Sequence, residues 1–169
     1  MKNLLLRVAI LLPLASLGMS VFAETLTDRL SLSNDFRFRQ EHIDTTNDTS
    51  LPNNRQRFRA RLGLDYKVND KVTGGLHLAS GSTDPVSTNQ SLEGGFTTKS
   101  IGIDRAYVQW SPLDNFEILA GKQKNPFYTI HDSELIWDGD LRPEGISTSY
   151  SCGCGDWIFS ASLAKFVVE

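Results

Sequence analysis

The chain has 169 residues, a mean hydropathy of −0.25 and a formal net charge of −3 at pH 7. A mildly acidic chain gives no reason to expect a nucleic-acid partner. Cys152 and Cys154 are separated by one glycine, and no histidine or further cysteine stands near them to complete a tetrahedral metal site. A disulfide between residues this close would be strained, so we expect a thiol pair or a labile bond in a turn, and no metal or cofactor.

The N-terminus has the layout of a secretory signal peptide. Lys2 and Arg7 form a positive region before the short apolar run at 8–17, and a cleavage-site pattern of small residues ends at Ala23. We therefore expect residues 1–23 to be removed by cleavage after Ala23. A retained anchor helix is the weaker interpretation, because the apolar run falls short of the roughly 20 residues that a membrane span needs and Pro13 interrupts it.

Two segments that follow have the period of two that is typical of β-strands. Over 55–68, the odd positions carry four arginines followed by a glycine, an aspartate and a lysine, and the residues between them are mostly apolar. The segment 29–41 alternates in the same way and places Arg37 and Arg39 on its polar side. Because successive side chains of a strand point to opposite faces, each segment has one apolar face and one arginine-rich face.

One hairpin register between these segments keeps both apolar faces on the same side of the sheet. It joins Glu41 with Arg55, Arg39 with Arg57, Arg37 with Arg59, and Asp35 with Arg61. The pairing leaves a central block of arginines flanked by two acid–arginine pairs. Strand partners cannot neutralise this block, so it requires water, anions or acids from elsewhere in the chain.

The remaining chain divides into five further predicted strands: 72–80, 101–110, 116–121, 145–151 and one that begins near Trp157. Tight turns at 68–72 and 111–115 alternate with long connections at 81–99 and 123–144. Arg105 and Tyr107 fall on the polar side of their strand. Ile101 and Ile103 fall on that side too, which predicts a β-bulge or a contact with the loop.

Alternation of short turns with long connections is typical of transmembrane β-barrels, whose polar faces line a water-filled lumen. The predicted fold class is therefore an all-β, antiparallel transmembrane β-barrel of about seven strands, with a secreted β-sandwich as the alternative. Single-chain bacterial barrels generally have an even number of strands, and an open sheet leaves unpaired edges in lipid. We therefore expect residues 24–169 to be the N-terminal portion of a larger barrel.

Five blocks of sequence, taken in order, resemble the putative porin family of bacterial outer-membrane barrels. They are NRQRFRARLGL (54–64), STNQ (87–90), DRAYVQW (104–110), GKQKNPF (121–127) and IWDGDLRPEG (136–145). The resemblance implies a channel in the outer membrane of a Gram-negative bacterium, and porins are often homotrimers. Barrels of this type usually end on a strand with a terminal aromatic residue, and Glu169 departs from that pattern.

Two sets of side chains are candidates for the lining of the channel. The predicted pore-lining residues are Arg37, Arg39, Arg55, Arg57, Arg59, Arg61, Arg105 and Tyr107. The candidate constriction loop carries the acids Asp132, Glu134, Asp138, Asp140 and Glu144. A connection this long is usually functional, and folding into the lumen would bring its carboxylates opposite the arginines. The alternative is an external loop whose acids stay solvated or bind divalent ions.

The predicted function is passive diffusion of small hydrophilic solutes or ions through a barrel set in outer-membrane lipid. The arginines favour anions and the loop acids favour cations, so the selectivity stays open, with a lean toward anions. The alternative is a non-conducting, plugged barrel that serves as an adhesin or structural protein of the envelope; a soluble secreted β-domain is a third hypothesis. An enzyme is disfavoured, because the histidines (His42, His77, His131) lie on separate segments with no serine–histidine–acid constellation.

Overall fold

The computed structural model describes residues 27–43 and 53–168, which form one antiparallel sheet. The predicted signal peptide, with its cleavage after Ala23, lies outside the described residues. The elements are β1 (Leu30–Ile43), β2 (Asn53–Asn69), β3 (Val72–Ser80), β4 (Gln90–Ser91), β5 (Ile101–Leu113), β6 (Phe116–Lys122), the 3-10 turn η1 (Ile130–Asp132), β7 (Glu144–Cys154) and β8 (Trp157–Phe166).

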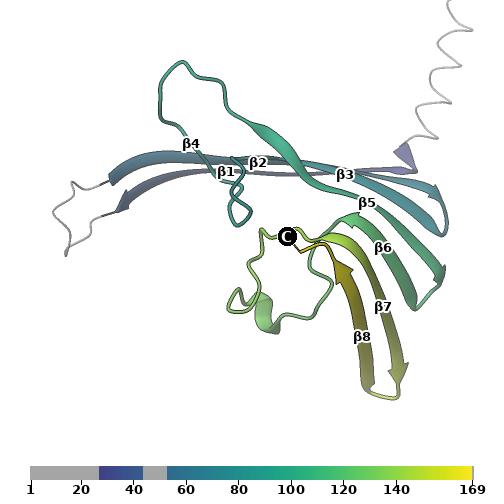
Figure 1. The fold of residues 1–169 in the computed structure, drawn as a ribbon. Coiled ribbons are helices and arrows are strands. Elements are labelled where there is room, and N and C mark those ends of the chain that lie inside the picture. Colours follow the sequence, from purple (N-terminus) through teal and green to yellow (C-terminus); the bar gives the residue numbers. More distant parts are fainter. Residues whose placement is uncertain (1–26, 44–52, 169) are drawn as a thin grey trace, which may run out of the picture.

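The sheet has the order β1-β2-β3-β5-β6-β7-β8, with β4 paired to β2 outside this path. Every neighbour along the path is therefore the next long strand in the chain, as in an up-and-down meander. Figure 1 shows the sheet curving from β1 to β8, with the β6–β7 connection and η1 on its concave side. β1 and β8 are the two edges, and no pairing between them is present among the described residues. An all-β antiparallel sheet is thus confirmed, and the sheet is open.

The predicted register of the first hairpin is confirmed. The partners are Glu41 with Arg55, Arg39 with Arg57, Arg37 with Arg59, and Asp35 with Arg61. The apolar partners alternate with these pairs, as in Phe36 with Ala60 and Phe38 with Phe58. The period of two therefore places the arginines of both strands on one face and the aliphatic and aromatic residues on the other.

A predicted irregularity in the fourth long strand is also present. The pairing of β3 with β5 passes from His77–Arg105 to Leu78–Ile103, so Asp104 is the extra residue of a β-bulge. The bulge returns Ile101 and Ile103 to the apolar side of the sheet, where both are exposed.

Three predicted boundaries are wrong. The segment 81–99 is not simply a loop, because it contains β4, an eighth strand that alternation over two residues cannot reveal. β5 continues to Leu113, so its turn to β6 is shorter than predicted. β7 runs to Cys154, which places both cysteines in the strand rather than in the turn, and Cys152 is a free thiol.

The described residues form a single layer with almost no hydrophobic core. Ala79 is the one buried hydrophobic residue among them, whereas large apolar side chains along the sheet are exposed, for example Phe36 at 72% and Leu163 at 76%. No helix within 27–43 and 53–168 has the length and apolar character that crossing a membrane would require. The sheet therefore presents one continuous apolar surface to its surroundings.

Candidate functional site: the arginine face

Six arginines of β1 and β2 share the polar face of the first hairpin, and we call this set the arginine row. Its members are Arg37, Arg39, Arg55, Arg57, Arg59 and Arg61. Alternation alone brings them together, because the register pairs polar positions with polar positions across the two strands. The predicted pore-lining arginines of this hairpin therefore share one face, and their role in lining a pore stays a prediction.

Two carboxylates of β1 hold most of the row. Glu41 pairs with Arg39, with Arg55 Nε at 2.5 Å and with Arg57 at 3.8 Å. Asp35 pairs with Arg59 at 2.5 Å and with Arg61 at 3.9 Å. Each acid therefore bridges several guanidinium groups and limits their mutual repulsion.

The segment that follows β3 lies against the same row. Arg61 donates to Thr88 Oγ1 at 2.6 Å, and Arg37 donates to Asn89 Oδ1 at 2.6 Å. β4 then pairs with β2 through Arg57–Ser91 and Phe58–Gln90. Sequence reasoning missed this contact, and the run of small hydroxyl and amide side chains at 87–90 was the one signal that pointed to it.

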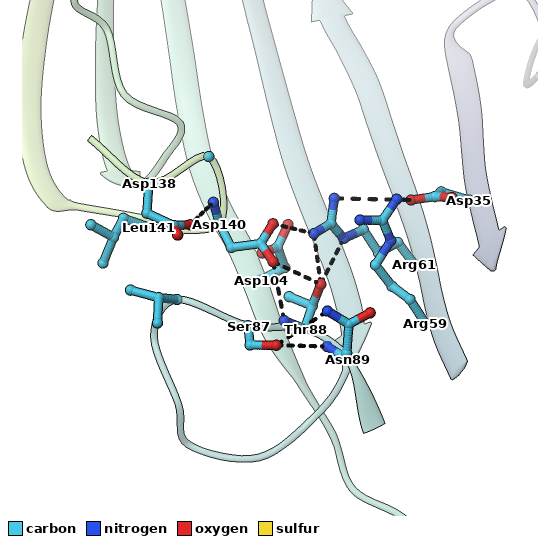
Figure 2. Close-up of polar contacts among 12 residues, drawn as sticks. Asp35, Arg59, Arg61, Ser87, Thr88, Asn89, Asp104, Asp138, Asp140 and Leu141 are labelled. Atoms are coloured by element: carbon cyan, nitrogen blue, oxygen red, sulfur yellow. Dashed lines mark hydrogen bonds and ion pairs between the residues drawn. The ribbon is translucent and has the colours of Figure 1, made fainter. Parts of the chain in front are cut away.

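The β6–β7 connection reaches the arginine row through Asp140. Figure 2 shows its carboxylate between Arg61 and Thr88: one oxygen accepts from Arg61, and the other accepts from the Thr88 backbone N–H at 3.2 Å. Asp140 and the row thus come from segments 79 residues apart in the chain. The carboxylate of Asp140 contacts the guanidinium of Arg61 directly, so the two charges neutralise each other. They do not face each other across an open channel, as a constriction between the loop and the row would require.

Three other acids of the proposed constriction loop, Glu134, Asp138 and Glu144, have partners outside the row in the described part of the chain. Glu134 accepts the backbone N–H of Gly139 at 3.1 Å, and Asp138 accepts that of Asp140 at 2.7 Å, so both shape the turn before Asp140. Glu144 is not a loop residue but the first residue of β7, where it pairs with Lys122 at 2.8 Å. The side chain of Asp132 lies outside the described residues.

The charge of Asp140 is favoured by its surroundings. Partial burial acts to raise the pKa of Asp140, but the Thr88 N–H and the charge of Arg61 act against it and prevail. The pKa of Asp140 therefore lies below its usual value. With Asp35, Glu41 and Asp140 as its acidic partners, the row of six guanidinium groups keeps an excess of three positive charges.

A second polar network crosses β2, β3 and β5 beside the row. Arg105 donates to His77 Nδ1 at 2.7 Å, so the ring proton is on Nε2, which donates to Asp65 Oδ1 at 2.8 Å. The hydroxyl of Tyr107 donates to the same oxygen at 2.7 Å. The predicted lining residues Arg105 and Tyr107 are thus held by His77 and Asp65, neither of which was among the predicted lining residues.

The Tyr107 ring lies over its strand partner Gly75, in the space that a side chain there would fill. A Cβ at Gly75 would stand 2.4 Å from the Tyr107 ring and 2.6 Å from Asp65 Oδ1, too close for any ordinary contact. Gly75 is therefore required by the side chain that crosses it.

Three cavities open on this side of the sheet. One of about 540 Å³ lies among the ends of β3 and β5, the connection and residues 166–168. Another, of about 350 Å³, is lined by Arg105, Tyr107, Glu117 and Lys124. The third, of about 300 Å³, is lined by Arg61, Lys124, Trp137 and Arg142. The concave face is therefore hollowed, and each cavity has both charged and apolar side chains in its lining.

Comparison with known proteins identifies the family of this chain. No curated protein matches the chain. A family model described as putative porin matches residues 24–167, which begin at the residue predicted to start the mature chain and include every strand of the sheet. The chain therefore belongs to the putative porin family.

Proposed function

We propose that the protein is a porin: an outer-membrane β-barrel whose water-filled lumen lets small hydrophilic solutes or ions diffuse passively. The observation that carries this proposal is the division of the sheet into an exposed apolar face and a charged face with a row of arginines. In a membrane, the apolar face has a natural partner in lipid and the charged face in water. Membership of the putative porin family supports the same conclusion.

A preference for anions is part of the proposal. The arginine row keeps three more positive than negative charges, and a lumen wall of that sign raises the local concentration of anions. The Nε atoms of Arg37, Arg39, Arg57 and Arg59 are buried without a hydrogen-bond partner among the described residues. The row is therefore only partly satisfied by its own acids. The homotrimer implied by the family resemblance stays a prediction.

Reversal potentials test both the channel and its selectivity. In planar bilayers with a potassium chloride gradient, we expect stepwise conductance and a reversal potential of the sign that anion preference gives. Arg57→Glu with Arg59→Glu changes the charge of the row by four units and should move the reversal potential toward cations.

The matched control makes the same change of charge near the turn between β2 and β3, with Arg29→Glu and Lys71→Glu. Their side chains donate to the carbonyl oxygens of Val68 and Pro112, away from the row. The control should leave the reversal potential nearly unchanged. Equal potentials for wild type and for the Arg57 and Arg59 variant would remove the arginine row from the conduction path.

A plugged barrel that serves as an adhesin or envelope protein is the second candidate, and one observation favours it. Residues 87–91 cover part of the arginine row through Arg37, Arg57 and Arg61, as a plug would. The bilayer experiment separates the two candidates. A protein that is folded and inserted but gives no conductance steps would support the plug.

A further inference from the structure

Lys124 lies on the concave face outside the arginine row, and the proposed function assigns it no role. It stands just after β6, and its side chain is exposed. Among the described residues it has neither an ion pair nor a hydrogen bond from its ammonium group, and it lines both the 350 Å³ and the 300 Å³ cavities. Lys124 is thus an accessible cation at the boundary of two cavities.

The charges that act most strongly on Lys124 are mostly positive. Desolvation lowers the pKa of Lys124, and the charges of Arg105, Arg142 and Arg61 lower it further, while Asp104 opposes them. Asp104 itself is held by Arg142 Nε at 3.1 Å and by Arg105 Nε at 3.8 Å, and its side chain is only 7% exposed. The carboxylate of Asp104 is therefore already shared by two arginines, and no acid among the described residues forms an ion pair with Lys124.

The 300 Å³ cavity combines this positive charge with an apolar wall. Arg61, Lys124 and Arg142 contribute charge, and Phe127, Trp137 and Leu141 contribute apolar surface. The buried Trp137 Nε1–H has no hydrogen-bond partner among the described residues. Glu134 and Asp138 also line this cavity, and each accepts a backbone N–H of the turn.

We propose that Lys124 is the centre of a binding subsite for small organic carboxylates on the solute path. This inference rests on the proposed channel function and names a class of solute for it. The carboxylate would accept charge-assisted hydrogen bonds from the Lys124 ammonium, because the other two cations of this lining, Arg61 and Arg142, are already paired with Asp140 and Asp104. The carbon skeleton would lie against Phe127, Trp137 and Leu141. An inorganic anion would use the charge but gain nothing from the apolar wall.

Tryptophan fluorescence can measure this binding without any conductance. The protein has three tryptophans, so Trp110→Phe with Trp157→Phe leaves Trp137 as the sole reporter. In this background, refolded in detergent micelles, benzoate should change the Trp137 emission in a saturable way. Benzyl alcohol, which has the same ring without the charge, should bind far more weakly. Lys124→Gln should weaken benzoate binding by about tenfold, the usual effect of losing one charge-assisted contact.

Two matched variants separate the role of the charge from effects on folding. Lys124→Arg keeps the charge and should keep most of the affinity. Lys99→Gln removes a lysine that donates to Glu93 and Thr97 within its own loop, and it should bind benzoate like the parent. Heat-modifiable mobility on a gel checks that each variant is folded.

Equal affinity of the Lys124→Gln and Lys99→Gln variants for benzoate, or equal binding of benzoate and benzyl alcohol, would overturn the subsite. Because binding is read in micelles, failure of the subsite is distinct from failure of the channel. If benzoate binding is saturable and depends on Lys124 but the protein gives no conductance steps, the binding site is supported and the porin function is rejected.

Discussion

Asp140 ties the β6–β7 connection to the arginine row. Its carboxylate accepts from Arg61 and from the backbone of Thr88, so three segments meet at one side chain. Removing it leaves Arg61 with Thr88 and with Asp35 at 3.9 Å. Hydrogen bonds to charged groups typically contribute about 1.5–3 kcal/mol, so this residue is expected to control how firmly the connection is held.

Asp140→Asn should therefore loosen the connection and increase the fluctuations of the open-channel current, and the lost carboxylate should strengthen anion preference. The contact also has a defined pH dependence. Because folding lowers the pKa of Asp140, its contribution is present above the usual range of aspartate and is lost as the pH falls through the lowered value. Current noise recorded against pH should rise for wild type on acidification and stay high and flat for Asp140→Asn.

Glu134→Gln is the control for this prediction. Glu134 belongs to the same connection, but its partner is the Gly139 backbone N–H, which a glutamine oxygen can also accept. This variant should match wild type at neutral pH. If it behaves like Asp140→Asn, loss of any acid in the connection has the same effect, and the contact with Arg61 is not what holds the segment.

At the scale of elements, the glycine at position 75 gives the sharpest test, because the neighbouring glycine serves as its control. A Cβ at Gly75 collides with the Tyr107 ring and with Asp65, whereas a Cβ at Gly74 meets nothing within 4 Å. Gly75→Ala should destabilise the sheet by about 1–3 kcal/mol, as overpacking does. Gly74→Ala should be neutral or slightly stabilising, because it only restricts the unfolded chain.

Urea titration of protein folded in liposomes, followed by heat-modifiable mobility, would measure both variants. A Gly75→Ala protein as stable as Gly74→Ala would mean that Tyr107 can move aside without loss. In that case the hydrogen bond from Tyr107 to Asp65 would not hold β2, β3 and β5 together.

The strands were predictable from the sequence because alternation of polar and apolar residues is a local pattern, and it fixes which face of the sheet each side chain occupies. The pairing of Asp35 with Arg61 and of Glu41 with Arg55 follows once both apolar faces must lie together. The displaced parity of Ile101 and Ile103 likewise pointed to the bulge at Asp104. Each of these features needs only the order of polar and apolar residues along one strand or two.

The candidate site was predictable only in part, because loops carry no such period. Asp140 contacts the arginine row, whereas Glu134 and Asp138 bond to the turn before it. This choice among the acids depends on the path of the whole connection. The contact of Thr88 with Arg61 is likewise made by residues 27 apart in the chain, on a segment with no regular pattern. Contacts of this kind depend on how distant segments fit together in three dimensions, and the local sequence pattern of a loop does not specify that fit.

At the scale of the whole molecule, the exposed apolar face is the property that most needs an explanation. In water, an open single layer gains little from hydrophobic burial, since Ala79 is the one buried apolar residue among those described. Insertion into lipid gives the same side chains an apolar environment, whereas the arginine row requires water or counter-charges. The two hypotheses therefore differ in the environment of the apolar side chains: lipid for a membrane barrel, and water for a soluble secreted sheet.

Neighbouring residues of β8 distinguish these proposals. Leu163 is 76% exposed on the apolar face, and Ser162, the preceding residue, lies on the polar face opposite Ser149. In a bilayer, Leu163→Arg should cost about 2–4 kcal/mol, whereas Ser162→Arg should lose little beyond its 3.2 Å contact with Ser149. In a soluble sheet neither change buries a charge, so both would be tolerated. Folding into liposomes at graded urea concentrations measures the free energy of unfolding of each variant. Equal stability of the two variants would contradict a lipid-facing β8.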